Sequence, residues 1–144
     1  MERVEVKIRL FKGGKMPERK SAAAACFDAY ARLSAPVVIE KGRREKIPLG
    51  FAYEVPEGYE VQVRPRSGLT SSEIDLGFGT GDEDYRGELC ACVINNSAVP
   101  FTINNGDRVC QIAVRPVPFV ELVEVSELSE TERGEDGFGS TGLR

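Results

Sequence analysis

The residue types best suited to chemistry are concentrated in one glycine-rich stretch, Gly77–Gly87. Glycines at alternate positions open it, and they let the backbone turn sharply and let another molecule approach closely. Three acidic residues, Tyr85 and Arg86 follow before the closing glycine. The flanking segments are extended and apolar, which predicts the tip of a β-hairpin. Its backbone can bind the edge of a planar base and Asp82 can hold a water molecule; the alternative is an acidic surface turn.

A second candidate site, for an anion, begins at Pro65. Pro65 fixes one backbone angle and Gly68 permits a left-handed one, so the amides near Ser67 and Gly68 can point into one concavity. Arg66 adds a bidentate phosphate donor, and Ser67 adds a hydroxyl. A single helical turn beginning at 70–72 could direct its amino end to the same place. The alternative is a strand-end turn with a solvent-facing arginine.

Two polar residues interrupt apolar segments elsewhere in the chain. Asp28 is the one charge within Cys26–Ala31. It is either a turn or edge residue, or a carboxylate near a metal or a cationic side chain. Gln111 interrupts an apolar run in the same way, so it is either exposed at an edge or reaches a ligand.

The chain after Ser126 is polar and glycine-rich, with Phe138 as its one aromatic residue. Composition alone favours a disordered terminus. An aromatic ring flanked by glycines, beside Arg133 and the pair Ser140–Thr141, is also what a flexible lid needs. The ring can stack on a base, and the polar groups can bind phosphates.

Composition narrows the class of protein. The chain has 144 residues and a formal net charge of −4, which is typical of an ordinary soluble domain. A mildly acidic chain argues against nucleic acid as a partner, because binding the phosphate backbone needs a basic face. No signal peptide or membrane span is visible, so we expect no membrane association and a cytoplasmic location.

The chain contains four cysteines and no histidine. No Cys-x-x-Cys motif is present, which argues against a zinc site and favours buried, reduced thiols. Without histidine, Ser-His-Asp and Cys-His catalysis within one chain are excluded. Any general base is therefore a carboxylate or, less favourably, a lysine or tyrosine.

Short alternating segments with no convincing long helix predict an all-β sandwich, jelly roll or barrel. The turn signal at 104–107 predicts a hairpin between the strands before and after it. We expect residues 1–125 to form a single β domain and residues 126–144 to form a flexible C-terminal arm. The predicted strands cover residues 2–10, 26–31, 35–40, 43–47, 50–55, 59–64, 88–95, 99–103, 108–114 and 119–125.

Five stretches together resemble the motifs of the trimeric dUTPases, which convert dUTP to dUMP and pyrophosphate. The resemblance spans nearly the whole chain, and its second, third and fifth motifs are specific. It implies an all-β, jelly-roll-like antiparallel β-barrel or sandwich, assembled as a homotrimer with active sites at the subunit interfaces. In order, the five stretches are residues 25–28, 65–69, 79–87, 106–111 and 133–142.

The resemblance also implies a role for each candidate residue. Asp82 would hold and deprotonate the attacking water, and Tyr85 would lie against the deoxyribose and exclude a 2′-hydroxyl. Asp28 would help position Mg²⁺ through water, the metal being carried mainly by the triphosphate. The remaining substrate-binding residues would be Gly79, Thr80 and Gly81 at the uracil edge; Arg66, Ser67, Gly68 and Gln111 at the phosphates; and, from a closing tail, Phe138 and Gly139 with Arg133, Ser140 and Thr141.

The sequence departs from the family pattern at several positions. Gly81 replaces a bulky aliphatic residue just before the proposed base. Cys26 and Asp136 stand where glycine is usual, and Ala29 stands where leucine is common. The segment between the second and third motifs is about one residue short and lacks its usual basic character. We therefore expect weaker substrate binding than in a typical member.

Two other functions remain as hypotheses. A dCTP deaminase-like enzyme shares the implied fold, but that chemistry uses a glutamate base, whereas this chain offers Asp82. A non-catalytic nucleotide-binding or regulatory trimer is the other. Such a protein would be expected to lack Asp82, Ser67 or the tail motif, and all three are present.

Overall fold

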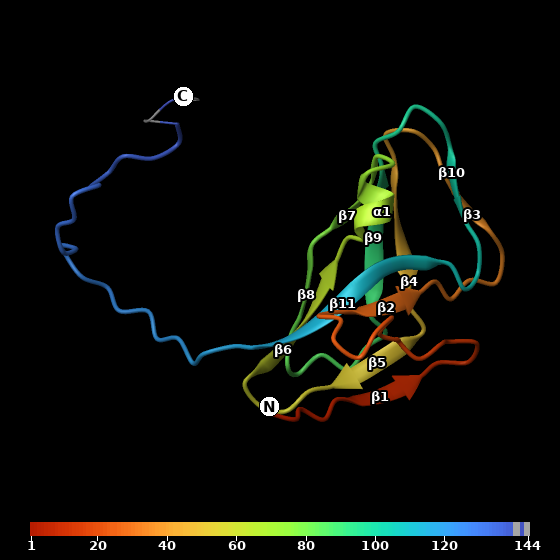
Figure 1. Cartoon of the computed structure of the whole chain (residues 1–144), viewed down its shortest axis with the longest axis horizontal. Helices are drawn as coiled ribbons and strands as arrows, with labels where there is room; N and C mark the ends of the chain where they lie inside the picture. The colour runs from red at the N-terminus through yellow and green to blue at the C-terminus, as the bar shows by residue number, and fades with distance from the viewer. Residues whose placement is uncertain (140–141, 143–144) are drawn as a thin grey trace.

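The computed structural model describes residues 1–139 and 142. Within these residues the chain folds into short strands and one helical turn (Figure 1). No helix among them is long and apolar enough to cross a membrane. The elements are β1 (Lys7–Leu10), β2 (Phe27–Tyr30), β3 (Val37–Ile39), β4 (Arg44–Pro48), β5 (Phe51–Glu54), β6 (Tyr59–Arg64), α1 (Ser67–Thr70), β7 (Ile74–Gly77), β8 (Gly79–Gly81), β9 (Cys90–Asn95), β10 (Phe101–Ile103) and β11 (Arg108–Pro116).

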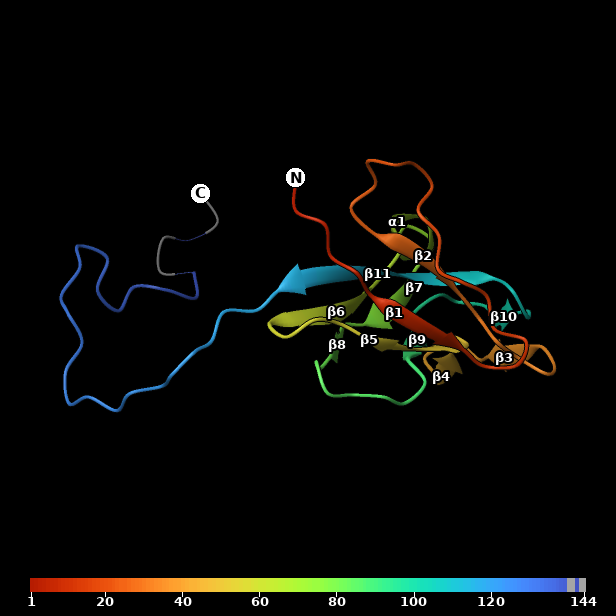
Figure 2. The same cartoon turned by 90° about the horizontal axis from the view of Figure 1, so that it is seen from below.

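The strands form four small sheets in which every pair is antiparallel. The largest has the order β2-β11-β6-β8, and a second has the order β4-β9-β7. Two pairs, β1-β5 and β10-β3, complete the set. Figure 2 shows β11 running alongside β6 and β2 through the body of the molecule. This architecture is the jelly-roll class that the sequence predicts.

The core is built by the alternating strands. In β9 every second residue is buried, and in β6 Val61 and Val63 are buried while their neighbours are not, as expected for strands with one face on a core. Phe51, Ile39 and Ile47 are the largest side chains that are almost completely buried. The buried amide of Asn95 donates to the carbonyls of Ile39 and Val99, both at 2.8 Å, so its polar group is satisfied.

Three local predictions are wrong in detail. The first strand begins at Lys7 rather than at residue 2 and is mostly exposed. The helical turn begins at Ser67 rather than at 70–72. The turn at 104–107 forms, with Asp107 N donating to Asn104 O at 3.1 Å, but β10 and β11 on either side of it belong to different sheets. A turn signal fixes the local bend and not the partner of each strand.

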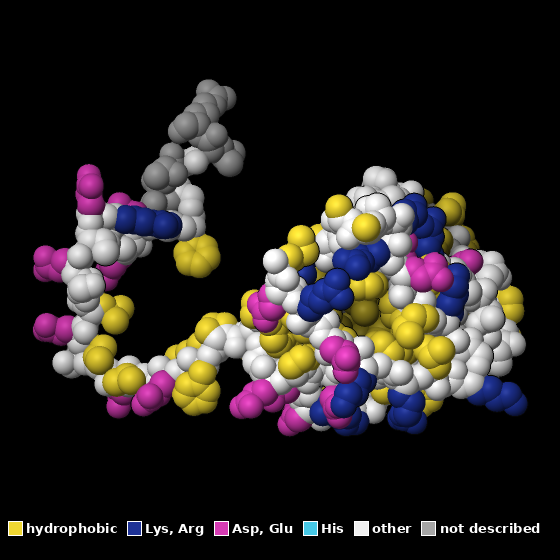
Figure 3. All heavy atoms as spheres, turned by 60° about the horizontal axis from the view of Figure 1, so that its bottom comes forward, with side chains coloured by type: hydrophobic (Ala, Val, Ile, Leu, Met, Phe, Trp, Pro, Cys, Tyr) yellow, Lys and Arg dark blue, Asp and Glu magenta, His cyan; other side chains and the backbone are white. Residues whose placement is uncertain are grey.

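The strand predicted over 119–125 does not form. After β11 the chain leaves the body and extends away from it (Figure 1). Phe119 is 97% exposed and Leu122 is 92% exposed, and Figure 3 shows apolar side chains spaced along this tail. An extended apolar segment becomes a strand only when another strand pairs with it, and the described part of the chain offers none here.

Candidate active site

The glycine-rich stretch forms an open strand edge. β7 and β9 pair with each other, as the predicted hairpin requires, and Gly79–Gly81 leaves that hairpin to pair with β6. β8 is the outermost strand of its sheet. Its outer main-chain groups therefore have no ladder partner in the described chain and are free to bind a planar base. Gly79 must be a glycine, because a Cβ there would lie 2.9 Å from Cβ of Val63.

Asp82 and Tyr85 lie beside this edge. With Gly79–Gly81 they line a pocket of about 240 Å³. The Asp82 side chain is exposed, while its main-chain carbonyl accepts a 2.8 Å hydrogen bond from the hydroxyl of Tyr53. The Tyr85 side chain is 44% exposed, and its hydroxyl donates to the Glu88 carbonyl at 2.9 Å. The predicted base, the predicted sugar-contacting ring and the predicted uracil-binding backbone are thus brought together.

A salt bridge borders the same pocket. The Glu88 carboxylate accepts hydrogen bonds from Nε and Nη2 of Arg32 at 2.8 and 2.7 Å, and a third from the amide of Gly50 at 2.8 Å. The hydrogen bonds from Arg32 lower the pKa of Glu88. Cys90 also lines the pocket, and burial raises the pKa of its thiol, so it is held as the neutral thiol.

The other predicted residues form a second group around Asp28. Oδ2 of Asp28 lies 3.3 Å from Nη1 of Arg108, and Oδ1 lies 3.9 Å from Nε of Arg66. Arg66 also donates from Nη1 to the Arg108 carbonyl at 3.0 Å. Gln111 is half-buried, and its amide donates to the Pro65 carbonyl at 2.9 Å. Asp28 lies on β2, an edge strand of its sheet, and also contacts cationic side chains, so the structure supports both of these interpretations.

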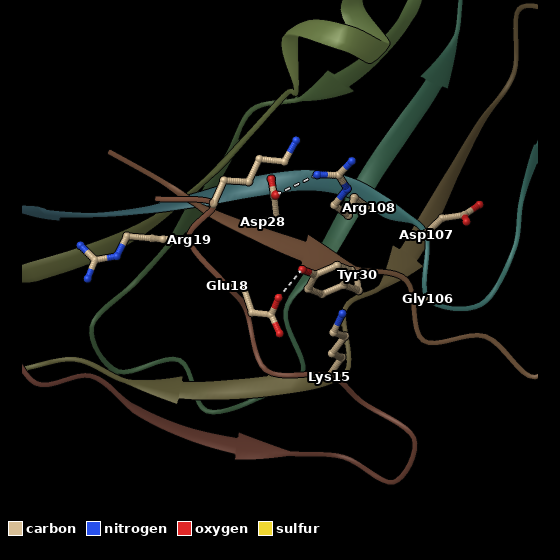
Figure 4. A pocket seen from close by; sticks show the side chains of 9 residues that line it. Lys15, Glu18, Arg19, Asp28, Tyr30, Gly106, Asp107 and Arg108 are labelled. Atoms are coloured by element: carbon tan, nitrogen blue, oxygen red, sulfur yellow. Dashed lines mark hydrogen bonds and ion pairs between the residues drawn. The ribbon is translucent and has the colours of Figure 1, made fainter. Parts of the chain in front are cut away.

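Two hollows adjoin this second group. One, of about 290 Å³, is lined by Arg66 and Arg108. The other, of about 480 Å³, lies between the loop before β2 and the start of β11 (Figure 4). There Asp28 and Arg108 point toward each other, and Nζ of Lys15 lies 4.0 Å from the centre of the Tyr30 ring. Ser67 and Gly68 open α1 next to Arg66, where the first amides of a helical turn have no acceptor within the turn.

The two groups lie at opposite ends of β6. Gly81 pairs with Val61, so Asp82 follows at the beginning of β6. Arg66 lies beyond the other end, just before α1. Six extended residues at about 3.3 Å each separate these ends by roughly 20 Å. Within one chain, Asp82 and Arg66 therefore line separate pockets.

The tail residues lie away from both groups (Figure 1). Nε of Arg133 donates to the Asp136 carbonyl at 2.6 Å. Phe138 is fully exposed and has a positive φ of 48°. Gly139 follows with a φ of 84°. Ser140 and Thr141 lie outside the described residues, so the predictions for them stay predictions.

Two residues that contact predicted site residues were assigned no role from the sequence. Tyr53 lies under Asp82, and Arg108 pairs with Asp28. With Gly81 in place of a bulky residue, the sequence indicates that some other side chain fills the space beside the proposed base, but not that this residue is Tyr53. Arg108 stands in the fourth motif, but no spacing rule connects it to Asp28, which is 80 residues away.

The chain is an all-β jelly roll with a carboxylate at an open strand edge and with arginines at the far end of the adjacent strand. This arrangement is of the class that can bind a nucleoside triphosphate. A family model described as dUTPase matches residues 12–142. The chain therefore belongs to the dUTPase family.

Individual relatives agree with this assignment. The deoxyuridine 5′-triphosphate nucleotidohydrolase of Bdellovibrio bacteriovorus is 43% identical over 147 residues, which cover 99% of each chain. The dUTPase of Staphylococcus bacteriophage 80alpha, solved with dUPNHPP, has a TM-score of 0.88 at 27% identity, covering 96% of this chain and 99% of that one. A mutant dUTPase from phage phi11 of S. aureus, described as showing the coordination of a structural Mg(II) ion, has a TM-score of 0.80 at 25% identity, covering 88% and 99%.

Proposed function

We propose that this chain hydrolyses dUTP to dUMP and pyrophosphate, with Asp82 as the general base. The family assignment and the relatives' names support the reaction. The observation that carries the assignment of the base is the exposed Asp82 carboxylate beside the open backbone edge of β8. Uracil bound at that edge would bring the rest of the nucleotide past Asp82.

In the proposed step, the Asp82 carboxylate accepts a proton from a water molecule as the water oxygen attacks phosphorus. The bond between the α- and β-phosphates breaks, and pyrophosphate leaves with the bonding electrons. A positioned carboxylate base contributes on the order of 10²–10⁴ in rate, so no histidine is required. Positioning and charge neutralisation supply most of the remainder in phosphate chemistry.

Specificity would come from two features of the same pocket. The main chain of Gly79–Gly81 offers fixed donors and acceptors, and a mismatched base leaves such groups unpaired at a cost of about 10⁴-fold. The Tyr85 ring lies at the exit of that edge, where it can lie against the deoxyribose and leave no room for a 2′-hydroxyl. Uracil would thus be distinguished from cytosine, and deoxyribose from ribose.

The second group fits a magnesium triphosphate. Arg66, Ser67, Gly68 and Gln111 would bind phosphate oxygens. Both ion-pair distances of Asp28 are long for charge-assisted hydrogen bonds, so its carboxylate can still accept from water. In this proposal the ion is carried mainly by the triphosphate of the substrate. Bound Mg²⁺ would offset phosphate charge, with Asp28 holding it through water.

We further propose that the active protein is a homotrimer whose sites are shared between copies. The roughly 20 Å along β6 between Asp82 and Arg66 supports this, because the proposed base and the proposed phosphate-binding arginine then lie in separate pockets of one chain. The exposed apolar segment around Phe119, Leu122 and Val125 is a suitable surface for pairing with a second copy. Residues 126–144 would then close over a site, placing Phe138 on the base. The four free cysteines fit a cytoplasmic location.

The test is pyrophosphate release from dUTP, dCTP, dTTP and UTP in the presence of Mg²⁺. Release from dUTP alone, lost in Asp82→Asn, is the expected result. Glu83→Gln is the matched control, because Glu83 is the neighbouring carboxylate and its Oε2 accepts from the amide of Gly58 at 2.7 Å, away from the pocket. Ammonia release from dCTP would favour a deaminase. Binding of dUTP without release would favour a non-catalytic trimer.

A further inference from the structure

We propose that Tyr53 is a positioning residue for the reaction, and that Tyr53 and Gly81 form a matched pair which holds Asp82 in place. This inference rests on the proposed role of Asp82 as the general base. Tyr53 lies on β5, outside all five motifs, and its side chain is 2% exposed. Its hydroxyl reaches the residue that the mechanism requires to be held most accurately.

The first observation is steric. A Cβ atom on Gly81 would lie 3.0 Å from Cζ of Tyr53 and closer still to its hydroxyl oxygen. Gly81 does not have a positive φ, so its backbone torsions do not require glycine. Two of the three nearest atoms, including the nearest, belong to Tyr53; the third is the Val61 main-chain carbonyl oxygen at 3.0 Å, which would also have to shift by a few tenths of an ångström. The tyrosine occupies the space that a bulky side chain at position 81 would fill.

The second observation is polar. The Tyr53 hydroxyl donates to the main-chain carbonyl of Asp82 at 2.8 Å. Burial, followed by the nearby Asp82 charge, raises the pKa of Tyr53 to about 12, so the hydroxyl remains a neutral donor at working pH. The carbonyl that it holds belongs to Asp82 itself, one residue after the end of β8. Fixing that peptide fixes the direction in which the catalytic carboxylate leaves the backbone.

The third observation concerns Tyr85. The rings of Tyr53 and Tyr85 have their centres 6.4 Å apart and are tilted by 47°, within the range of favourable aromatic pairs. Tyr85 is the residue proposed to lie against the deoxyribose. One buried side chain thus supports both the base and the sugar-contacting ring. In this chain a packed ring with a hydrogen bond does what an aliphatic side chain at position 81 would do by packing alone.

The experiment compares Tyr53→Phe with Tyr59→Phe, using kcat and KM for dUTP and the Tm of each variant. Tyr53→Phe keeps the ring and removes only the donor, so it should fold. We expect its kcat to fall about tenfold, with KM unchanged within about twofold, because the lost bond positions the base and does not bind substrate. Tyr59→Phe removes a hydroxyl that donates to Glu2 at 2.5 Å, and its kcat should match the parent.

A swap tests the matched pair independently. Tyr53→Ile and Gly81→Ile should each lower kcat/KM at least tenfold, the first by removing support and the second by steric overlap. The double variant Tyr53→Ile/Gly81→Ile should recover most of that loss, because one residue then fills the space of the other. Tyr53→Ile should also reduce the preference for dUTP over UTP, whereas Tyr53→Phe should retain it.

The outcomes separate this inference from the proposed function. If dUTP is hydrolysed and Asp82→Asn abolishes the activity, the proposed function stands, and an unchanged kcat in Tyr53→Phe then overturns the positioning role alone. A lower Tm with unchanged kcat would show a purely structural hydroxyl. Additive losses in the double variant would overturn the matched pair. Full activity in Asp82→Asn would overturn the proposed role of Asp82 as the base, and with it the premise of this inference.

Discussion

Oδ2 of Asp28 lies 3.3 Å from Nη1 of Arg108, a contact that joins β2 to β11 at the edge of the proposed phosphate site. Oδ1 of the same carboxylate faces Arg66. The carboxylate therefore orients the arginine that is proposed to bind phosphate. It also limits the repulsion between two neighbouring guanidinium groups before any substrate is bound.

Asp28→Asn is expected to lower the free energy of unfolding by about 1–2 kcal/mol, because two guanidinium groups lose a partly buried partner. It should also raise the Mg²⁺ concentration needed for half-maximal dUTP hydrolysis. Thermal denaturation and a Mg²⁺ titration measure the two effects.

Glu54→Gln is the matched control for Asp28, since Glu54 also pairs with two cations, Lys7 and Arg86, at 3.2 and 3.6 Å. That side chain is 46% exposed, so its loss should cost less than about 0.5 kcal/mol and leave the Mg²⁺ dependence unchanged. Equal effects of the two substitutions would show that Asp28 makes only an ordinary surface ion pair.

Acidification should weaken the fold through Glu88. Its pKa is lowered by the hydrogen bonds from Arg32, so the unfolded chain takes up the proton at a higher pH than the folded chain does. The contribution is therefore present above the unfolded-state pKa of about 4.3 and is lost as the pH falls through the lower folded value. Glu88→Gln should lower Tm at pH 7, and its difference from the parent should shrink as the pH falls below about 4.3. Parallel Tm curves for the two proteins across this range would contradict the assignment.

The sequence was most informative where a signal is local. The alternation over 59–64 predicted β6 with its bounds, because a strand on a core repeats every two residues. The glycines at 79 and 81 were recognised as sites of close approach. The opposing groups, Val63 and Tyr53, could not be named, since strand pairing sets those contacts. The same limit explains Arg108, whose partner Asp28 is far away in the chain.

Failures occurred where a pattern needs a partner that the sequence does not specify. Asn104–Asp107 predicts a turn correctly but says nothing about which strands its arms join. The segment at 119–125 has the apolar content of a strand but, in the described part of the chain, no strand to pair with. Its apolar side chains are consistent with a partner outside the single chain.

Phe138 should contribute to substrate binding only when the tail closes. Because stacking of an aromatic ring on a base is worth about 1–3 kcal/mol, Phe138→Ala should raise KM for dUTP roughly tenfold or more. Phe138→Trp keeps a stacking surface and should remain near the parent. Because the Phe138 ring is fully exposed, its removal should leave the fold intact and the Tm of the variant equal to that of the parent. A KM that is insensitive to Phe138→Ala would contradict closure of the tail over the base.

The separation of Asp82 from Arg66 leads to a test of shared sites. Trimers made only of Asp82→Asn chains should be nearly inactive, and so should trimers made only of Arg66→Gln chains, because every site then lacks one of the two groups. Trimers assembled at random from equal amounts of the two chains should recover about a quarter of the parent activity, since each site then has a one-half chance of an intact Asp82 and an independent one-half chance of an intact Arg66 from another copy. The measurement is dUTP hydrolysis after joint refolding, with light scattering to establish the trimer.

As a control, Asp82→Asn mixed with Asp82→Asn/Arg66→Gln should recover nothing, because no chain then carries the base. Mixed trimers without activity would mean that both groups act from one chain, in conflict with their positions at opposite ends of β6.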